Sequence, residues 1–407
     1  MAGAAEIKKD DNKDAIYQYD LAGKYYYGND VEKNIPEAVK IYLLAAEAGY
    51  APAQKEMGDM CYDGDDLKGD LKEAYRWYKL AAEQGHIEAQ SNLGYCYEHG
   101  EGVDQDFKQA HDWYKKSAEE GYSEAQYYLS CLYEEGNGVT QDEDISFSWA
   151  LKSAEQGYPD AQTFVGYCYH VGRVNESDNE QAFKWYLSAA TAGNETAMYN
   201  LGEMYYTGDF LKTDYKKAHH WFKLSADQGG CDSQKMLGDM YYYGQGVEEN
   251  LEESFRWYKL SADQDNPDGL QGLAFMYRYG QGTGKDIVEA FKCYKKSKKF
   301  GSEQADEEIK EMLSEESALL PLIIDNLITV GTEVAVMPDA EGKMKDLVEQ
   351  VKLLNKSNIK KDERIRELVE QVTVLTKSIS YQDDKPQKVK ELEWSDDEDE
   401  YITKPKV

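Results

Sequence analysis

Glycine recurs at a fixed interval of 36 residues over most of this 407-residue chain. The glycines that mark the interval are Gly28, Gly64, Gly100, Gly136, Gly172, Gly208, Gly244 and Gly280. Tryptophan keeps the same interval at Trp77, Trp113, Trp149, Trp185, Trp221 and Trp257, with Ile41 before this series and Cys293 after it. The register continues without insertion through eight copies over 14–301, which is 8 × 36 = 288 residues. A regular repeat of this length predicts stacked supersecondary units.

Each copy has the pattern of two helices joined by a glycine-containing loop. In the second copy, Ala53 and Met57 mark one face of the first helix, and Gly64 is suited to the left-handed residue that ends it. The second helix carries Trp77. One column of the first helix, represented by Gly58, contains only small residues in all eight copies. The sequence therefore predicts an all-α fold, a right-handed α/α solenoid of helix-turn-helix repeats in which large aromatic residues pack against this small column.

The segments 89–103 and 110–118 resemble SEL-one-like repeats, which are relatives of tetratricopeptide repeats, in spacing, loop and both helix patterns. The resemblance covers all eight copies. It implies an α/α superhelix that acts as a protein-binding adaptor or assembly scaffold, without a shared catalytic activity. The terminal copies depart from the pattern as end caps require, and residues 302–317 are expected to add a capping helix.

The segments outside the array have different compositions. Residues 1–13 are expected to be a disordered N-terminus. Residues 318–337 are the most apolar region of the chain, and we expect them to form a helix that packs on the last copy. The alternative is an exposed face for a partner or a membrane surface. Pro321 interrupts this segment, which is too short to span a bilayer.

Hydrophobic residues alternate at intervals of three and four over 344–379, which is the pattern of a coiled coil. The seam consists of Met344, Leu347, Val351, Leu354, Asn358, Ile365, Leu368, Val372, Leu375 and Ile379. Asn358 falls at an a position, where a polar residue lowers stability but fixes the register and favours a parallel dimer. We therefore expect a homodimer. The alternative is a single amphipathic helix folded back on the array.

Residues 382–407 are expected to be a disordered acidic tail, because 391–401 contains seven acidic residues and no basic one. The tail residues Leu392, Glu393, Trp394, Ser395 and Asp396 resemble the tryptophan-acidic motifs by which cargo adaptors bind kinesin light chain. In this interpretation Trp394 fills an apolar pocket and its acidic neighbours meet a basic groove. A chance match in an acidic background is the alternative.

The chain has 78 acidic and 46 basic residues and a formal charge of −32, which argues against nucleic acid and anionic membranes as partners. Its cysteines are Cys61, Cys96, Cys131, Cys168, Cys231 and Cys293. They occupy core columns of the repeat, which indicates small apolar residues in a reducing compartment and not metal ligands. The histidines lack metal-ligand spacing. We expect a cytoplasmic or nuclear protein without catalytic, metal or cofactor site.

In related tetratricopeptide arrays, the first helix of each copy lines the concave groove. The corresponding residues here are Tyr95, Tyr127, Tyr167, Tyr199, Tyr206, Glu88, Glu98, Glu124, Glu134, Asp160 and His170. Two interpretations stay open: a solvated acidic face, or a groove in which tyrosines make contacts and acidic residues select a basic or mixed peptide.

The expected function is that of a non-enzymatic adaptor. The solenoid would hold one protein partner, the coiled coil would multimerise the chain, and the tail would bind a second partner. The alternative is a regulatory subunit of an enzyme complex, of the cell-wall synthase activator or ubiquitin-ligase adaptor type.

Overall fold

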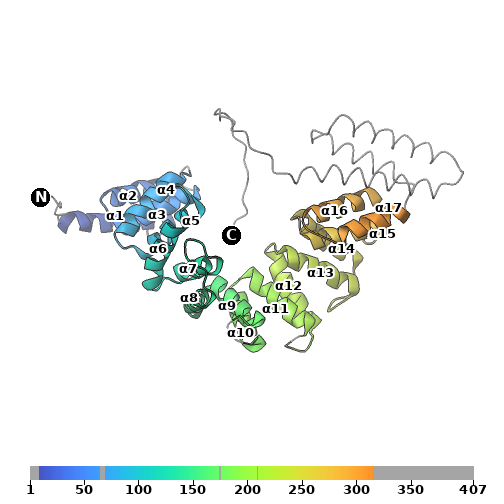
Figure 1. Cartoon of the computed structure of the whole chain (residues 1–407). Helices are drawn as coiled ribbons and strands as arrows, with labels where there is room; N and C mark the ends of the chain where they lie inside the picture. The colour runs from blue at the N-terminus through green and yellow to red at the C-terminus, as the bar shows by residue number, and fades with distance from the viewer. Residues whose placement is uncertain (1–8, 65–68, 174–175, 209, 316–407) are drawn as a thin grey trace, which may run out of the picture. The chain divides into compact units, whose positions relative to one another are not determined.

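The computed structural model describes residues 9–64, 69–173, 176–208 and 210–315. These residues form seventeen helices and no strand (Figure 1). The helices are α1 (Lys9–Tyr27), α2 (Ile35–Glu47), α3 (Ala51–Asp63), α4 (Leu71–Glu83), α5 (Ile87–His99), α6 (Phe107–Glu119), α7 (Ser123–Glu135), α8 (Glu143–Glu155), α9 (Pro159–Val171), α10 (Asn179–Thr191), α11 (Glu195–Thr207), α12 (Tyr215–Asp227), α13 (Cys231–Tyr243), α14 (Leu251–Asp263), α15 (Pro267–Tyr279), α16 (Ile287–Lys299) and α17 (Ala305–Glu315). The predicted all-α solenoid of repeats is confirmed.

The chain divides within α14 into two compact units, unit 1 (Met1–Trp257) and unit 2 (Tyr258–Val407). Odd-numbered helices from α1 to α15 are the first helices of the eight copies and are called A helices below. Even-numbered helices from α2 to α16 are the second helices and are called B helices. From α1 to α13, each helix packs against the next one in sequence (Figure 1).

Backbone geometry fixes where the helices end and begin. The A helix α3 ends at Gly64, which has a left-handed φ of 70° and donates its N–H to the carbonyl of Met60. A residue with a Cβ is strained in this conformation, which accounts for the glycine at this place in every copy. The B helix α4 begins after Asp70, whose carboxylate accepts hydrogen bonds from the N–H groups of Lys72 and Glu73 at 3.0 and 3.2 Å. Asp or Asn caps all eight B helices in the same way.

The small column predicted from Gly58 is where the two helices of a copy come into close contact. A Cβ built on Gly58 would lie 2.5 Å from ring carbons of Tyr78, on the B helix of the same copy. The distance from Gly94 to Tyr114 is 2.7 Å on the same measure. The predicted packing of large aromatic residues against small ones is therefore confirmed.

The fourth copy changes both members of this contact. Ser130 stands in the small column, and Ala150 stands twenty residues later, at the place of the aromatic residue. Both side chains are fully buried. A hydroxymethyl group fits the column here because the opposing residue is small, so the two columns compensate each other in volume.

Buried glutamines link successive copies. Gln126 on α7 donates to the carbonyl of Ala118 on α6 at 3.1 Å, and its own side-chain carbonyl accepts a hydrogen bond from Gln156 after α8 at 2.8 Å. Gln54, Gln90, Gln162 and Gln234 donate to the preceding B helix in the same way. These bonds pair the amide N–H groups in the interior, where an unpaired polar group is costly, whereas the side-chain oxygens of Gln90 and Gln162 have no partner among the described residues.

The ends of the array differ from the expected boundaries at one point. Residues 9–13, which were expected to belong to a disordered N-terminus, are part of α1. Ala15 and Ala22 of this helix are buried within the expected array, whereas residues 9–13 are all polar. At the other end, α17 packs on α16 within the expected 302–317, with Ala305 and Met312 buried. The segments 318–337, 344–379 and 382–407 lie outside the described residues.

Candidate protein-binding surface

All eleven predicted groove residues lie on A helices of unit 1. Helix α5 carries Glu88, Tyr95 and Glu98, α7 carries Glu124, Tyr127 and Glu134, α9 carries Asp160, Tyr167 and His170, and α11 carries Tyr199 and Tyr206. Each has part of its surface exposed, whereas Leu93 and Leu129 on the same helices are fully buried. We call these eleven residues, together with Lys55, Glu56, Asp59, Tyr62, Asn92, Tyr122, Tyr128 and Tyr158, the A-helix surface.

Tyrosine rings form a continuous series across copies two to five of this surface. The ring of Tyr95 lies 6.2 Å from those of Tyr62 and Tyr128, measured between centroids. Tyr128 lies 5.9 Å from Tyr127, which in turn lies 5.4 Å from Tyr158. The structure therefore brings Tyr95 and Tyr127 together through Tyr128, which the sequence analysis missed. Its position directly after Tyr127 on the same helix was the available signal.

The three other predicted tyrosines lie further along unit 1 and have partners of their own. The hydroxyl of Tyr199 donates to Glu203 at 2.8 Å, and that of Tyr206 donates to Gln245 at 2.8 Å. Tyr167 is 42% exposed, and the Arg173 guanidinium carbon lies 5.4 Å from its ring centroid. An exposed ring beside a cation remains available for further contacts. His170 lies edge-on to the ring of Tyr186 at 6.3 Å.

The predicted carboxylates have partners within the chain. Glu98 accepts a hydrogen bond from Tyr114 at 2.7 Å, Glu124 accepts one from Tyr122 at 2.8 Å, and Asp160 accepts one from Asn194 at 2.7 Å. Glu134 pairs with Arg173. Burial raises the pKa of Glu98 above its usual value, although the bond from Tyr114 opposes the shift. These carboxylates are held in fixed positions, and each still has lone pairs for a ligand.

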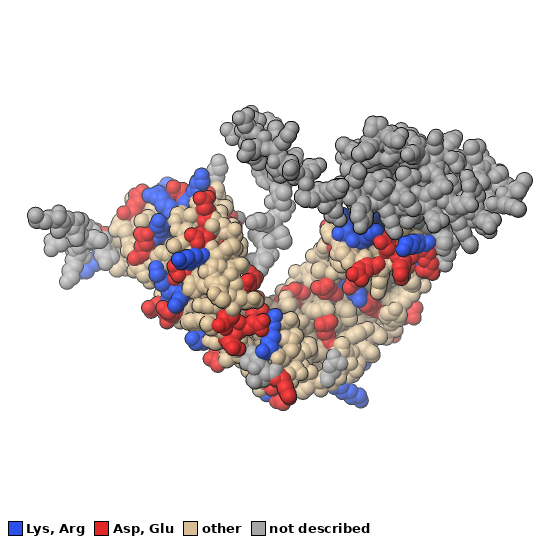
Figure 2. All heavy atoms as spheres, in the orientation of Figure 1, with Lys and Arg blue, Asp and Glu red and all other residues tan. Residues whose placement is uncertain are grey.

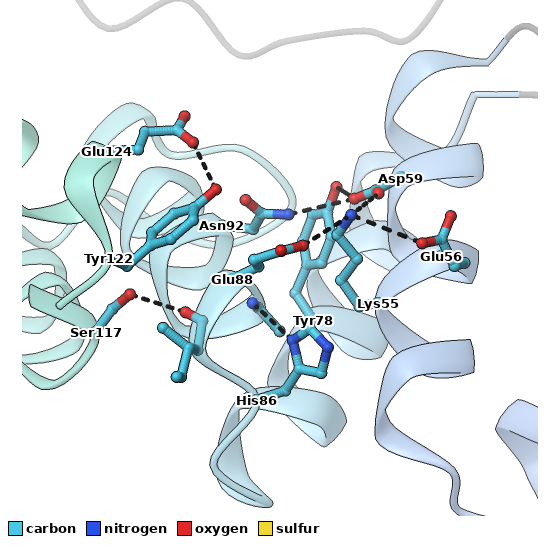
Figure 3. A network of polar contacts seen from close by, with 12 residues as sticks. Lys55, Glu56, Asp59, Tyr78, His86, Glu88, Asn92, Ser117, Tyr122 and Glu124 are labelled. Atoms are coloured by element: carbon cyan, nitrogen blue, oxygen red, sulfur yellow. Dashed lines mark hydrogen bonds and ion pairs between the residues drawn. The ribbon is translucent and has the colours of Figure 1, made fainter. Parts of the chain in front are cut away.

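A lysine between three carboxylates forms the most polar part of the surface (Figure 3). The ammonium of Lys55 lies 2.8 Å from Asp59, 3.2 Å from Glu88 and 3.8 Å from Glu56. Burial disfavours this cation, but the hydrogen bond and charge of Asp59, together with Glu56 and Glu88, raise the pKa of Lys55. Burial raises the pKa of Glu56 as well.

The carboxylate of Asp59 has two further hydrogen-bond partners. Asp59 also accepts hydrogen bonds from the hydroxyl of Tyr78 at 3.0 Å and from the amide of Asn92 at 3.2 Å. One lysine balances three carboxylates, so the cluster retains an excess of negative charge.

The thiols near this surface are poor nucleophiles. Burial raises the pKa of Cys96 and Cys131 to about 12 and that of Cys168 to about 11, so these thiols stay protonated near neutral pH. Within the described ranges, no group of three His, Cys, Asp or Glu side chains is placed to hold a metal ion. No helix in this part of the chain is long and apolar enough to cross a membrane.

Helix pairs stacked at a constant period, with side chains displayed along successive A helices, define the class of α/α-solenoid repeat proteins. A model of the Sel1 repeat matches eight times, at residues 15–50, 51–86, 87–122, 123–158, 159–194, 196–230, 231–266 and 267–299. The chain therefore belongs to the Sel1 repeat family, and the predicted resemblance is confirmed. The fold is typical of scaffolds for protein–protein interaction.

Solved structures agree with this assignment. A protective antigen of uropathogenic Escherichia coli with an SLR fold is 24% identical, with a TM-score of 0.61, and the match covers 98% of this chain and all of that chain. A Sel1 repeat protein from Oxalobacter formigenes is 28% identical, with a TM-score of 0.55 over 76% of this chain and 91% of that one. None of the curated proteins matches this chain.

Proposed function

We propose that this protein is a non-enzymatic adaptor whose A-helix surface binds a segment of another protein. The tyrosine series from Tyr62 to Tyr158 is the observation that carries the proposal. Tyrosine supplies a large, rigid contact area with a polar tip, and it is enriched among the residues that dominate binding energy at protein interfaces. A solvated acidic face alone would not require these rings to be in contact across copies.

The proposed ligand is a peptide segment with basic side chains. Lys55 lies among three carboxylates, so a further cation placed beside this cluster would be attracted. The faces of tyrosine rings also attract ammonium and guanidinium groups. A strongly acidic segment would be repelled by the same cluster.

Peptides of graded charge test this proposal by fluorescence anisotropy with the full-length protein. Two substitutions copy residues that the array already uses at equivalent positions: Tyr95→Cys copies Cys131, and Tyr127→Lys copies Lys55. Basic peptides are expected to bind, and each substitution is expected to weaken binding about tenfold or more. Tyr17→Ala is the control, because Tyr17 is 67% exposed on α1, away from the tyrosine series.

Equal affinity of the parent, Tyr95→Cys and Tyr127→Lys for every peptide would contradict a role for these tyrosines. Circular dichroism of each variant shows whether the helices are retained, which separates loss of binding from loss of fold.

The proposal also includes self-association through residues 344–379 and capture of a second partner, such as kinesin light chain, by Leu392–Asp396. The heptad seam and the tryptophan-acidic sequence support these parts. Affinity purification with full-length protein, a form lacking 382–407 and Trp394→Ala tests the tail. An identical set of partners from all three would show that the tail motif is inert.

A further inference from the structure

The last B helix carries a lysine cluster that departs from the repeat pattern. Residues 292–299 of α16 contain five lysines and no acidic residue, in a chain with a charge of −32. Where Lys299 stands, the seven earlier copies have Glu47, Glu83, Glu119, Glu155, Thr191, Asp227 and Asp263. The reversal from acidic to basic is confined to the last copy, so the repeat itself does not account for it.

Neighbouring acidic residues account for three of the five lysines. Lys292 pairs with Glu289 at 2.7 Å, Lys296 pairs with Asp265, and Lys298 pairs with Asp306 on the capping helix α17 at 2.6 Å. Lys298 occupies the column where all seven other copies have a buried alanine, so capping explains its presence. Lysines in the last turn also interact favourably with the helix dipole.

The other two lysines of this cluster have no such acidic partner in the described part of the chain. Lys295 and Lys299 are exposed, and neither forms an ion pair with any residue that the structure describes. Partial burial of the Lys295 side chain lowers its pKa.

An exposed aromatic ring lies beside these lysines. Phe300 is 40% exposed, and the Lys299 ammonium lies 5.7 Å from its ring centroid. Figure 2 shows Lys and Arg side chains gathered over α16, next to the acidic side chains of this end of unit 2. We call Lys295, Lys299 and Phe300 the α16 patch.

We propose that the α16 patch binds residues 391–400 of the same chain. This segment contains seven acidic residues and no basic one, so its charge is complementary to the two unpaired lysines. It also contains Leu392 and Trp394, which are apolar partners for the exposed ring of Phe300. The patch and the segment thus match in both charge and apolar character.

The length of chain between the two favours this occupant over a separate molecule. Residues 316–390, which are 390 − 315 = 75 residues, connect the end of α17 to the segment. Because the patch and the segment belong to one chain, this tether sets the effective concentration at which they meet. Other acidic molecules would have to compete at that concentration.

Binding at the α16 patch would withhold Leu392–Asp396 from a second partner. This consequence rests on the proposed role of the tail motif, whereas the binding itself does not. Added negative charge on Ser395 would strengthen the attraction to the patch.

Two measurements on the full-length protein test the proposal. Carbodiimide joins lysine amines directly to carboxylates in contact, and it is expected to link Lys295 or Lys299 to residues 391–400 at low salt. The links are expected to disappear near 0.5 M salt, where the Debye length is about 4 Å. Mixing isotopically labelled and unlabelled protein distinguishes links within one chain from links between chains.

The second measurement follows Trp394 by fluorine NMR after incorporation of fluorotryptophan, with Trp394→Phe to assign its signal. Lys295→Glu/Lys299→Glu is expected to move this signal to the position it has at high salt. Lys216→Glu/Lys259→Glu is the control, because both lysines are exposed on other B helices and the change in net charge is equal. The control is expected to leave the signal in place.

Absence of links at low salt, links found only between different chains, or an equal response of the control would each overturn the proposal. Loss of tail-dependent partners with intact links would instead contradict the proposed function of the motif, so the two failures can be told apart.

Discussion

The imidazole of His219 on α12 stands edge-on to the ring of Tyr241 on α13, with centroids 5.5 Å apart and planes at 83°. Aromatic pairs occupy the same two columns at the four preceding junctions: Tyr75–Tyr97, His111–Tyr133, Phe147–Tyr169 and Phe183–Tyr205, with centroids 5.6 to 5.9 Å apart. Each pair joins the B helix of one copy to the A helix of the next. Edge-to-face contacts are favourable beyond the area they bury, so they help to hold the copies in register.

His219→Phe is expected to make the stability of the protein less dependent on pH. Burial, with Lys223 and His220 adding to it, lowers the pKa of His219 below 6.5 in the folded state. Its Nε2 atom is buried without a hydrogen-bond partner among the described residues. The unfolded chain therefore takes up a proton first as the pH falls below 6.5, and stability is lost in that range. Phenylalanine does not titrate, and Phe183 already occupies the same column in the preceding copy.

Urea unfolding midpoints near neutral pH and near pH 5 measure this effect. The drop in midpoint on acidification should be smaller for His219→Phe than for the parent. His220→Phe, which removes only the smaller contribution of the exposed neighbour, should keep most of the parent's drop. An unchanged drop in His219→Phe would show that this imidazole is not the titrating group.

Gly94→Ser is expected to lower the free energy of unfolding by roughly 1–3 kcal/mol, because a Cβ at this position would lie 2.7 Å from the ring of Tyr114. Combining it with Tyr114→Ala recreates the Ser130 and Ala150 pair of the fourth copy. The double variant should lose less stability than the sum of the two single changes. Gly94→Ser with Tyr97→Ala is the control and should be additive, since Tyr97 faces Tyr75 instead. Additivity in both cycles would contradict compensation between the columns.

Asp106→Ala is expected to lower the free energy of unfolding by about 1 kcal/mol. The Asp106 carboxylate accepts hydrogen bonds from the N–H groups of Lys108 and Gln109, both at 3.0 Å, at the start of α6. Alanine would leave these two groups without their cap. Urea unfolding checks the loss, and Asp104→Ala at an exposed site in the same loop should leave stability within a few tenths of a kcal/mol.

Leu354→Asp/Leu368→Asp is expected to convert a dimer into a monomer, because charges at d positions oppose a coiled-coil seam. Sedimentation equilibrium of the full chain should give a mass near twice 46.4 kDa for the parent and near 46.4 kDa for the variant. Thr373→Asp, outside the a and d positions, should remain dimeric. A parent that sediments as a monomer at high concentration would remove self-association from the proposed function.

Most of the fold could be predicted from the sequence, because the contacts that determine it are local. The stop at Gly64, the small column of Gly58 and the aromatic residue twenty places later depend on contacts within one helix pair, and the 36-residue period repeats them in every copy. The structure confirmed the array, and its first helix begins at Lys9, before the expected start of the array at residue 14. The repeat columns also placed all eleven candidate residues on A helices of unit 1.

The partners of those residues were decided by the tertiary structure alone. The position of a residue in the repeat predicts which face of its helix it occupies. It does not predict which residue of the adjoining helix it contacts. Glu98 meets Tyr114 across 16 positions, and Glu134 meets Arg173 across 39. The sequence by itself thus determined the stacked helix pairs and the chemistry on their exposed face. Only the packing of one copy on the next decided which tyrosines touch and which carboxylates are bonded, because side-chain bonds of a few ångströms depend on helix register and rotamer.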